Sequence, residues 1–307
     1  MKILYMGTPD FAVLPLEKLI KDGHEIVGVV TREDKPKGRG MKVSMTPVKE
    51  FVLTQGLRVF QPQSLKDEAI MPLLCELTPD LIVVVAYGKL LPRYILDFPK
   101  YGCINLHGSL LPKYRGSAPI QHAVLNGDKI TGVTTMLMNE GMDTGDILLK
   151  KELVIEENDT SESVFDKLSA IGSELLSETV KALADGTVTP VPQDESEATY
   201  APPIRKDDAK ISWDMSSDKI LNLIRGSYSW PIAYTDSDIG RIKIYEACMC
   251  DAHGTPGEVI GLNDDGLCVA TADSSISIMR FQVESGKRMA PADYFRGHQS
   301  IEGTFFK

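Results

Sequence analysis

The sequence has little cysteine and no long apolar run. Its five cysteines are odd in number, scattered over 307 residues and include no CxxC pair, so neither a disulfide framework nor a cysteine-based zinc site is indicated. No segment approaches the roughly 20 apolar residues that a membrane-spanning helix needs. The first residues, MKILYMGTPDF, lack the basic start, apolar middle and small-residue cleavage site of a secretory signal. These absences predict a cytoplasmic protein with no membrane association.

The chain also lacks an excess of positive charge. Its 33 Lys plus Arg face 43 Asp plus Glu, which gives a formal net charge of −10. Because nonspecific binding to phosphates requires excess Lys and Arg, this balance excludes a protein that coats nucleic acid. Any RNA partner must meet a local basic patch. The segment TREDKPKGRGMK holds five basic residues against two acidic ones, a local balance of +3, although a solvated surface loop would look the same: Arg32, Lys35, Lys37, Arg39 and Lys42.

What remains is the composition of an ordinary globular protein, with 43% hydrophobic and 25% charged residues. Apolar strand-like runs alternate with helical patterns over almost two hundred residues. This alternation predicts an α/β fold with a doubly wound, mostly parallel, Rossmann-like sheet, whose ligands bind at the carboxyl ends of the strands. The predicted strands are Lys2–Met6, Ile26–Val30, Leu57–Phe60, Leu81–Ala86, Ile104–Leu106 and Thr134–Met138, and a helix is predicted over Ser161–Ala184.

A change in composition and hydrophobic pattern near residue 190 predicts a second domain, as the chain length also does. The stretch QDESEATYAPPIRKDDAK is polar and contains prolines, and short β-type runs separated by Gly, Asp and Asn turns follow it. We therefore expect a catalytic domain over residues 1–189, a surface linker over 190–208 and a smaller OB-like β-barrel over 209–307. The last segment is itself acidic, so any RNA-binding face in it must gather its basic residues.

The first turn has the sequence GTPDFA and not GxGxxG. Pro9 and Asp10 stand where a bound pyrophosphate would need glycine and free helix-end amides, which argues against a dinucleotide-dependent dehydrogenase. Thr8 is expected to cap a helix that has Pro9 at its first position, a structural role.

The most unusual residues lie in CINLHGSLLPKYRGSAP and in MNEGMDTGDI. Asn105 and His107 are two apart in a strand and so point to one face near its carboxyl end, while Asp143 lies in a glycine-flanked loop after a later strand. Each alone has a bland interpretation, a structural histidine or a turn aspartate. Together they supply an amide donor, a titratable imidazole and a carboxylate, the groups that acyl transfer to an amine requires.

The string INLHGSLLPKYRGSAPIQ, with AYGKLLP before it and GMDTGDI after it, resembles the core of the 10-formyltetrahydrofolate-dependent formyltransferases. The resemblance implies that 10-formyltetrahydrofolate donates the formyl group without a metal. It also implies that Asn105 and His107 donate to the oxyanion of the tetrahedral centre, while Asp143 holds the imidazole. Two segments would line the folate site, with Arg115 and Gly116 shaping the second: Tyr87, Gly88 and Leu90, then Ser109, Leu110, Leu111 and Pro112.

The core motifs identify the formyl donor better than the acceptor. The opening GTPDFAVLPLEKLI, the basic loop and a β-rich second domain entered through AKISWD resemble the members that formylate methionyl-initiator tRNA. That resemblance implies contacts to the tRNA by Lys37, Arg39 and Lys42, and we expect a monomer. Sugar-nucleotide or purine-precursor formyltransferases and a formate-releasing hydrolase remain alternatives. So do an RNA-binding or folate-binding protein without catalysis, but Asn105, His107 and Asp143 argue against these.

Overall fold

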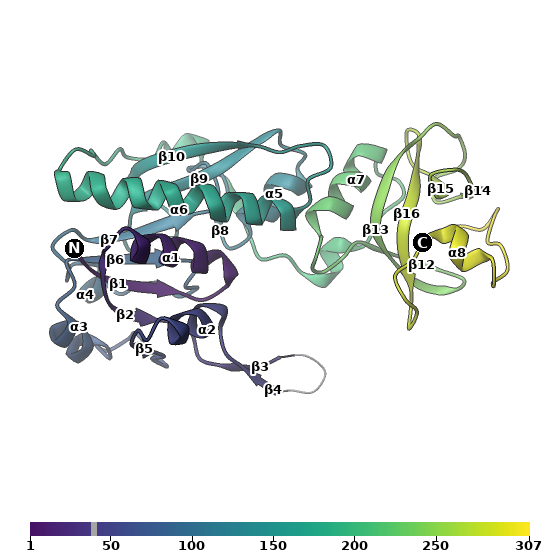
Figure 1. The fold of residues 1–307 in the computed structure, drawn as a ribbon. Coiled ribbons are helices and arrows are strands. Elements are labelled where there is room, and N and C mark those ends of the chain that lie inside the picture. The colour runs from purple at the N-terminus through teal and green to yellow at the C-terminus, as the bar shows by residue number, and fades with distance from the viewer. Residues whose placement is uncertain (38–41) are drawn as a thin grey trace. The chain divides into compact units, whose positions relative to one another are not determined.

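The computed structural model describes residues 1–37 and 42–307 and divides the chain into two compact units (Figure 1). The first comprises Met1–Pro119, Ile130–Val154 and Phe165–Pro202. The second comprises Ile120–Lys129, Ile155–Val164 and Pro203–Lys307. The units are therefore interleaved along the sequence, and the polar segment before Pro203 belongs to the first unit.

A seven-stranded, mostly parallel sheet forms the centre of the first unit, as predicted. Its strand order is β10-β9-β7-β6-β1-β2-β5. Neighbours are parallel from β7 to β5, whereas β9 is antiparallel to both β7 and β10. The strands are β1 (Lys2–Gly7), β2 (Glu25–Val30), β5 (Val59–Phe60), β6 (Leu81–Val85), β7 (Cys103–His107), β9 (Ile130–Leu137) and β10 (Ile147–Val154).

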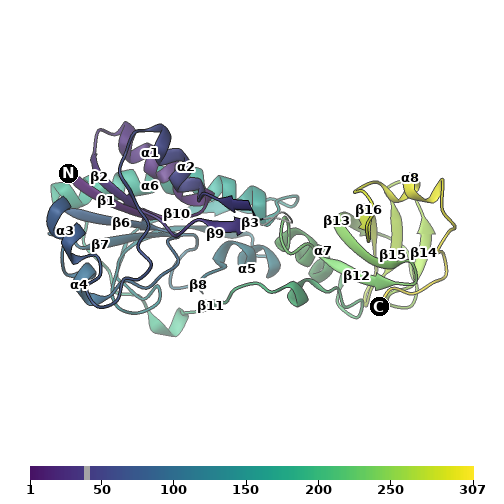
Figure 2. The ribbon, with the colours of Figure 1, turned by 90° about the horizontal axis from the view of Figure 1, so that it is seen from below.

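Helices cover both faces of this sheet, which explains why its central strands read as continuous apolar runs. Every residue of β6 and β7 is buried. Figure 2 shows α1 and α6 on one side of the sheet and α3 and α4 on the other. The helices of this unit are α1 (Val13–Lys21), α2 (Pro47–Thr54), α3 (Met71–Leu77), α4 (Arg93–Leu96) and most of α6 (Ser161–Asp185), whereas α5 (Pro119–Leu125) belongs almost wholly to the second unit. Because both faces of the sheet are covered, a ligand-binding site can form only at the strand ends and in the loops.

The predicted helix cap at Thr8 is wrong. A 3-10 turn, η1 (Asp10–Ala12), precedes α1, its N-cap residue is Pro9, and no side chain caps it. The Thr8 hydroxyl instead donates to the carbonyl oxygen of Tyr87 at 3.3 Å. Thr8 therefore connects the end of β1 to the segment that follows β6.

Two short strand pairs complete the first unit. Strands β3 (Lys35–Lys37) and β4 (Lys42–Ser44) pair as an antiparallel hairpin, and residues 38–41 between them are not described. Strand β8 (Arg115–Gly116) pairs in parallel with β11 (Tyr200–Ala201). The second pair joins the loop after β7 to the polar segment predicted as a linker.

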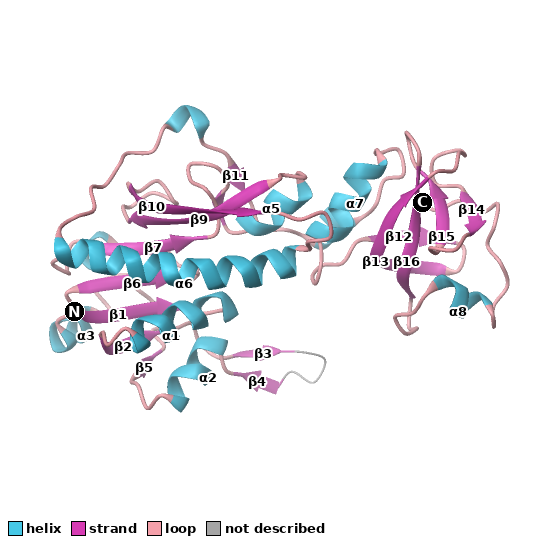
Figure 3. Ribbon diagram, turned by 45° about the horizontal axis from the view of Figure 1, so that its top comes forward, coloured by secondary structure: helices cyan, strands magenta, loops and turns pink. Residues whose placement is uncertain are grey.

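The second unit is built on a five-stranded antiparallel sheet curved into a half-barrel, consistent with the small β domain predicted (Figure 3). Its strand order is β12-β13-β16-β15-β14. The elements are α7 (Ser217–Gly226), β12 (Tyr234–Ser237), β13 (Gly240–Cys250), β14 (Val259–Leu262), β15 (Leu267–Ala270), β16 (Ser275–Val283) and α8 (Pro291–Phe295), preceded by the 3-10 turn η3 (Lys206–Ala209). Helix α7 buries Ile220, Leu223 and Ile224, which share one helical face, against this sheet. Within the described ranges of both units, no helix has the length and apolar character needed to span a membrane.

Candidate functional site

Asn105 and His107 lie on β7, in the middle of the sheet, and their side chains are 8% and 6% exposed. Alternation along a strand places both on the same face. The Asn105 side-chain amide forms no hydrogen bond with any described residue. The two N–H donors and the oxygen of this amide are therefore available to a ligand.

The orientation of the His107 ring is fixed by the loop that follows β7. Its Nε2 atom lies 2.9 Å from the carbonyl oxygen of Tyr114. Because a carbonyl only accepts hydrogen bonds, Nε2 must carry a proton, and in the neutral ring Nδ1 then carries the lone pair. The Nδ1 atom faces Asp143 Oδ2 at 3.8 Å, which is too long for a direct hydrogen bond.

Asp143 lies between β9 and β10 in the left-handed backbone region, with φ of 54°. Its Oδ2 atom accepts a hydrogen bond of 2.8 Å from the backbone N–H of Gly116, and its side chain is 17% exposed. A backbone amide therefore orients this carboxylate, and the Tyr114 carbonyl orients the imidazole. The expectation that Asp143 itself holds the ring does not match this geometry. The carboxylate instead lies beside Nδ1, the ring nitrogen that can accept a proton.

The predicted folate segment after His107 is a fixed turn. The Ser109 hydroxyl donates to the Lys113 carbonyl at 2.6 Å. On β9, the Thr134 hydroxyl donates to the Ser109 carbonyl at 2.7 Å and accepts from the Leu111 N–H at 3.1 Å. Leu111 and Pro112 are buried, whereas Leu110 is partly exposed. The hydroxyl and the carbonyl of Ser109 are thus occupied within the protein.

The predicted folate segment after β6 offers hydrogen-bond donors. The backbone N–H groups from Tyr87 to Leu91 donate to no acceptor among the described residues. The Tyr87 ring is buried, its hydroxyl has no partner in the described structure, and burial raises the pKa of this phenol to about 12. Gly88 has φ of +79°, and a Cβ there would lie 3.2 Å from Arg32 Nη1. Leu90 is 64% exposed.

Two of the three residues predicted to contact tRNA belong to the β3–β4 hairpin. Lys37 ends β3 and Lys42 begins β4. Arg39 falls outside the described residues. The structure therefore locates the hairpin in the first unit, and the contacts of these three basic residues remain predictions.

Sequence reasoning missed the contribution of the polar segment before Pro203. The Gln193 side chain donates to the carbonyl oxygens of Asp143 at 2.9 Å and Gly145 at 2.7 Å. Thr199 Oγ1 accepts from the N–H of Tyr114 at 2.8 Å. The fully buried Arg115 forms hydrogen bonds with Gln193 and Glu195, and the Glu195 carboxylate raises the pKa of the guanidinium. Nothing in the local sequence distinguishes these residues from an ordinary polar linker.

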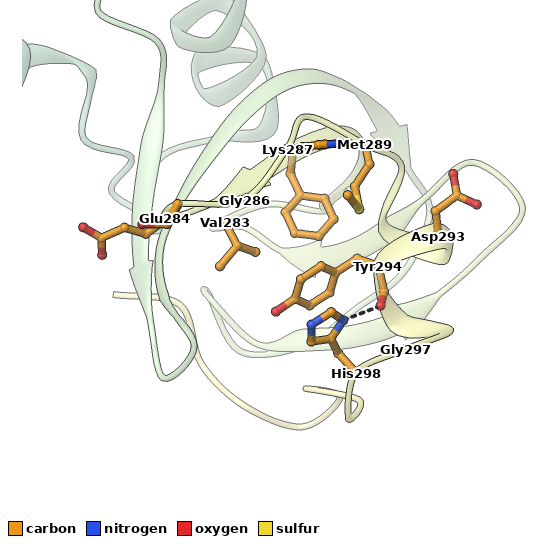
Figure 4. A pocket seen from close by; sticks show the side chains of 11 residues that line it. Val283, Glu284, Gly286, Lys287, Met289, Asp293, Tyr294, Gly297 and His298 are labelled. Carbon is orange, nitrogen blue, oxygen red and sulfur yellow. Dashed lines mark hydrogen bonds between the residues drawn. The ribbon is translucent and has the colours of Figure 1, made fainter. Parts of the chain in front are cut away.

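The second unit contains a pocket of its own, about 410 Å³ in volume, between β16 and α8 (Figure 4). The rings of Tyr294 and His298 stack there with centroids 3.9 Å apart, and His298 Nδ1 lies 2.8 Å from the Tyr294 carbonyl. None of the residues predicted for catalysis or folate binding lines it. The described parts of both units contain no group of three or more His, Cys, Asp or Glu arranged to hold a metal ion.

Comparison with protein families assigns both parts of the chain. The family model "Formyl transferase" matches residues 1–180, which include Asn105, His107 and Asp143. The model "Formyl transferase, C-terminal domain" matches residues 203–299. Together the two matches span most of the chain and leave the intervening polar segment unassigned.

Similar proteins extend over the whole chain. A methionyl-tRNA formyltransferase of Caldanaerobacter subterraneus subsp. tengcongensis is 47% identical, with all of both chains covered. That of Alkaliphilus oremlandii is also 47% identical, with 99% of each chain covered. Among solved structures, HypX from Aquifex aeolicus in complex with tetrahydrofolic acid has a TM-score of 0.65 at 16% identity. The match covers 100% of this chain and 51% of HypX, so it shows the fold alone.

Proposed function

The chain belongs to the formyl transferase family, and we propose that it transfers the formyl group of 10-formyltetrahydrofolate to the α-amino group of methionyl-initiator tRNA. One observation carries the proposal. The unpaired Asn105 amide and the facing His107 and Asp143 side chains lie together in a chain matched end to end by methionyl-tRNA formyltransferases. The product would be N-formylmethionyl-tRNA for translation initiation in the cytoplasm.

His107 acts through Nδ1. When the neutral amine attacks the formyl carbon, a C–N bond forms and the amine nitrogen becomes positively charged. Nδ1 takes one proton from that nitrogen, and the imidazolium that results faces the Asp143 carboxylate 3.8 Å away. The ring then returns the proton to N10 of the folate as the bond from N10 to the formyl carbon breaks, which restores neutral His107.

Asn105 stabilises the oxygen of the tetrahedral centre. Its side-chain N–H groups are not engaged by the described protein, so they can donate to the negative charge that develops there. While His107 is an imidazolium, Nδ1 can donate to the same oxygen, which preserves the donor role expected for it. Hydrogen-bond donors and one titratable ring suffice for this scheme.

The residues around the site fit a folate. When bound, 10-formyltetrahydrofolate supplies the activated formyl group, and the chain must bind its ring edge and exclude water. Donors and apolar surface come from the five backbone N–H groups from Tyr87 to Leu91 and from the Tyr87 hydroxyl, none of which has a partner among the described residues, and from the exposed Leu90. We propose that the turn of Ser109, Leu110, Leu111 and Pro112 also lines the folate site.

We assign the catalytic role to residues 1–189 and tRNA binding to the basic loop together with residues 209–307. Lys37, Arg39 and Lys42 would contact the phosphates of the acceptor stem, because phosphate contacts position a nucleic acid and need basic side chains. We expect a monomer to carry out the reaction.

The test is an acceptor panel. The pure protein is incubated with 10-formyltetrahydrofolate and, in separate reactions, with methionyl-initiator tRNA, free methionine, an amino-sugar nucleotide or no acceptor, each with and without EDTA. We expect formylation of the charged tRNA alone, unaffected by EDTA. Folate turnover with another acceptor or with water would support the proposed formyl donor and exclude methionyl-tRNA as the acceptor.

A further inference from the structure

The polar segment over residues 193–201 contacts both loops that orient the proposed catalytic pair. Gln193 bonds to the loop that carries Asp143, and Thr199 bonds to the loop that carries Tyr114. The Thr199 carbonyl also accepts from the Arg115 N–H at 2.8 Å, and the Ala201 carbonyl accepts from Ser117 N–H at 3.0 Å. The segment therefore joins two loops that lie about thirty residues apart in sequence.

The Gln193 side chain uses its full hydrogen-bonding capacity. Its two N–H groups donate to the carbonyls of Asp143 and Gly145. Its oxygen accepts from Arg115 Nε at 3.1 Å and from Arg115 Nη2 at 2.8 Å. An amide has two donors and two acceptor sites, so no other side chain of similar size reproduces this set. Arg115 precedes Gly116, whose N–H binds the Asp143 carboxylate.

The two residues that surround His107 both have strained backbones. Tyr114, which accepts from Nε2, has φ of 60°, and Asp143, which faces Nδ1, has φ of 54°. A non-glycine residue in this region is disfavoured by contact of its Cβ with the backbone and persists only where its surroundings hold it. The segment bonds to both, through Thr199 at Tyr114 and through Gln193 at Asp143.

We propose that Gln193 is a positioning residue for formyl transfer, which holds the Asp143 carboxylate beside His107 Nδ1. The proposal rests on the function proposed above. Gln193 touches neither His107 nor the expected substrates, and it acts by fixing the backbone of Asp143 and, through Arg115, the amide that orients its carboxylate. A displacement of about 1 Å at a reacting group can cost on the order of 100-fold in rate.

The test compares Gln193→Leu and Gln193→Glu with the wild type, with kcat expressed per folate-binding site so that unfolded protein does not count. Glu keeps an acceptor for Arg115 but places a second acceptor against the Asp143 and Gly145 carbonyls. We expect both variants to lose kcat at least tenfold while the KM for 10-formyltetrahydrofolate stays within twofold. Asp194→Ala is the matched control and should leave kcat unchanged, because the Asp194 carboxylate accepts from Ser196 and from no other residue that the structure describes.

A double-mutant cycle separates positioning from general stability. In an Asp143→Asn background, Gln193→Leu should change kcat less than twofold. Wild-type kcat in Gln193→Leu, rescue by Glu, or a full multiplicative loss in the double variant would overturn the inference. Failure of the wild type to formylate charged tRNA would instead count against the proposed function. In that case the positioning role is tested without activity, by the ring ¹⁵N NMR signals of His107. We expect Gln193→Leu to shift these signals, and unchanged signals would overturn the positioning role.

Discussion

At the residue scale, the account depends on which nitrogen of His107 is available. The Tyr114 carbonyl occupies Nε2, so the ring has one nitrogen left, and that nitrogen faces a carboxylate. Asn105, two residues earlier on the same strand, has an amide that no described residue uses. The donors and the acceptor of this amide are therefore available to a substrate that reaches the same face of the strand.

Asn105→Leu should separate activity from stability. The substitution removes an amide that has no partner among the described residues and places an apolar side chain of similar size at a residue that is only 8% exposed, so the free energy of unfolding should not fall. Turnover should drop on the order of 100-fold or more, because one oxyanion donor is lost. Chemical denaturation and single-turnover formylation measure the two effects. A large loss of stability with unchanged turnover would show that the amide has a structural role.

Tyr87→Phe and Tyr5→Phe form a matched pair of hydroxyl deletions. The Tyr5 hydroxyl donates to the Ala12 carbonyl at 2.7 Å, so Tyr5→Phe should cost about 1 kcal/mol of unfolding free energy. The Tyr87 hydroxyl has no described partner, so Tyr87→Phe should be neutral or stabilising in the ligand-free protein. Urea denaturation near pH 8 measures both. Equal losses would contradict the described geometry.

The pKa of Tyr87 adds a pH dependence. Burial raises it to about 12 from an ordinary 10, so the neutral phenol is favoured in the folded state. Its contribution to stability is complete below pH 10 and is lost as the pH rises from 10 through about 12. Tyr87→Phe should therefore lose less stability than the wild type between pH 9 and 11.5. Parallel stability curves for the two proteins would contradict this.

At the scale of elements, the loop between β9 and β10 brings Asp143 back to β7. Gly145 makes that path possible, since a Cβ there would clash with the Leu137 carbonyl oxygen. The Gly145 carbonyl also accepts from Gln193. This glycine is required by a close approach of two backbones and not by a left-handed φ.

Gly145→Ala should accordingly lower both the melting temperature and the rate of formyl transfer. Gly186→Ala is the control, because Gly186 has φ of +66° but nothing within 4 Å of the added Cβ. The control should cost about 1 kcal/mol of stability and leave turnover unchanged. Thermal melts and turnover per folate site measure both variants. Equal effects of the two substitutions would contradict the steric argument.

The same elements show what the sequence could and could not predict. The apolar run of β6 and the two-residue spacing of Asn105 and His107 are local patterns, and they predicted a buried strand and a shared face correctly. The predicted helix cap at Thr8 was wrong because a hydroxyl can bond to a carbonyl distant in sequence as well as to a nearby helix end. Here the Thr8 hydroxyl donates to the Tyr87 carbonyl. Gln193 carries no local signal, since its role arises only when three distant loops meet.

At the scale of the whole molecule, an acidic protein must bind an anionic substrate. The net charge is −10, and the basic residues before and after Arg39 form the clearest local exception in the sequence. Repulsion from the rest of the surface would oppose tRNA, so contacts from this loop should dominate the salt dependence of binding.

Arg39→Glu should therefore raise the KM for methionyl-tRNA at least tenfold and leave the KM for the folate unchanged. The slope of log affinity against log salt should become smaller by about one. Arg93→Glu is the control, since Arg93 pairs with Asp97 on the surface at 3.1 Å and makes the same change in net charge. Equal effects of the two variants would show that net charge, and not this loop, governs binding.

The central claim, that Asn105, His107 and Asp143 carry out formyl transfer to methionyl-tRNA, is tested most directly by Asp143→Asn. Single-turnover formylation of methionyl-initiator tRNA and folate binding are measured on the same preparation as the wild type. We predict a loss of at least 100-fold in the formylation rate with folate affinity within twofold, because Asp143 stabilises the imidazolium and does not line the folate segments. A variant that formylates the tRNA at the wild-type rate would contradict the account.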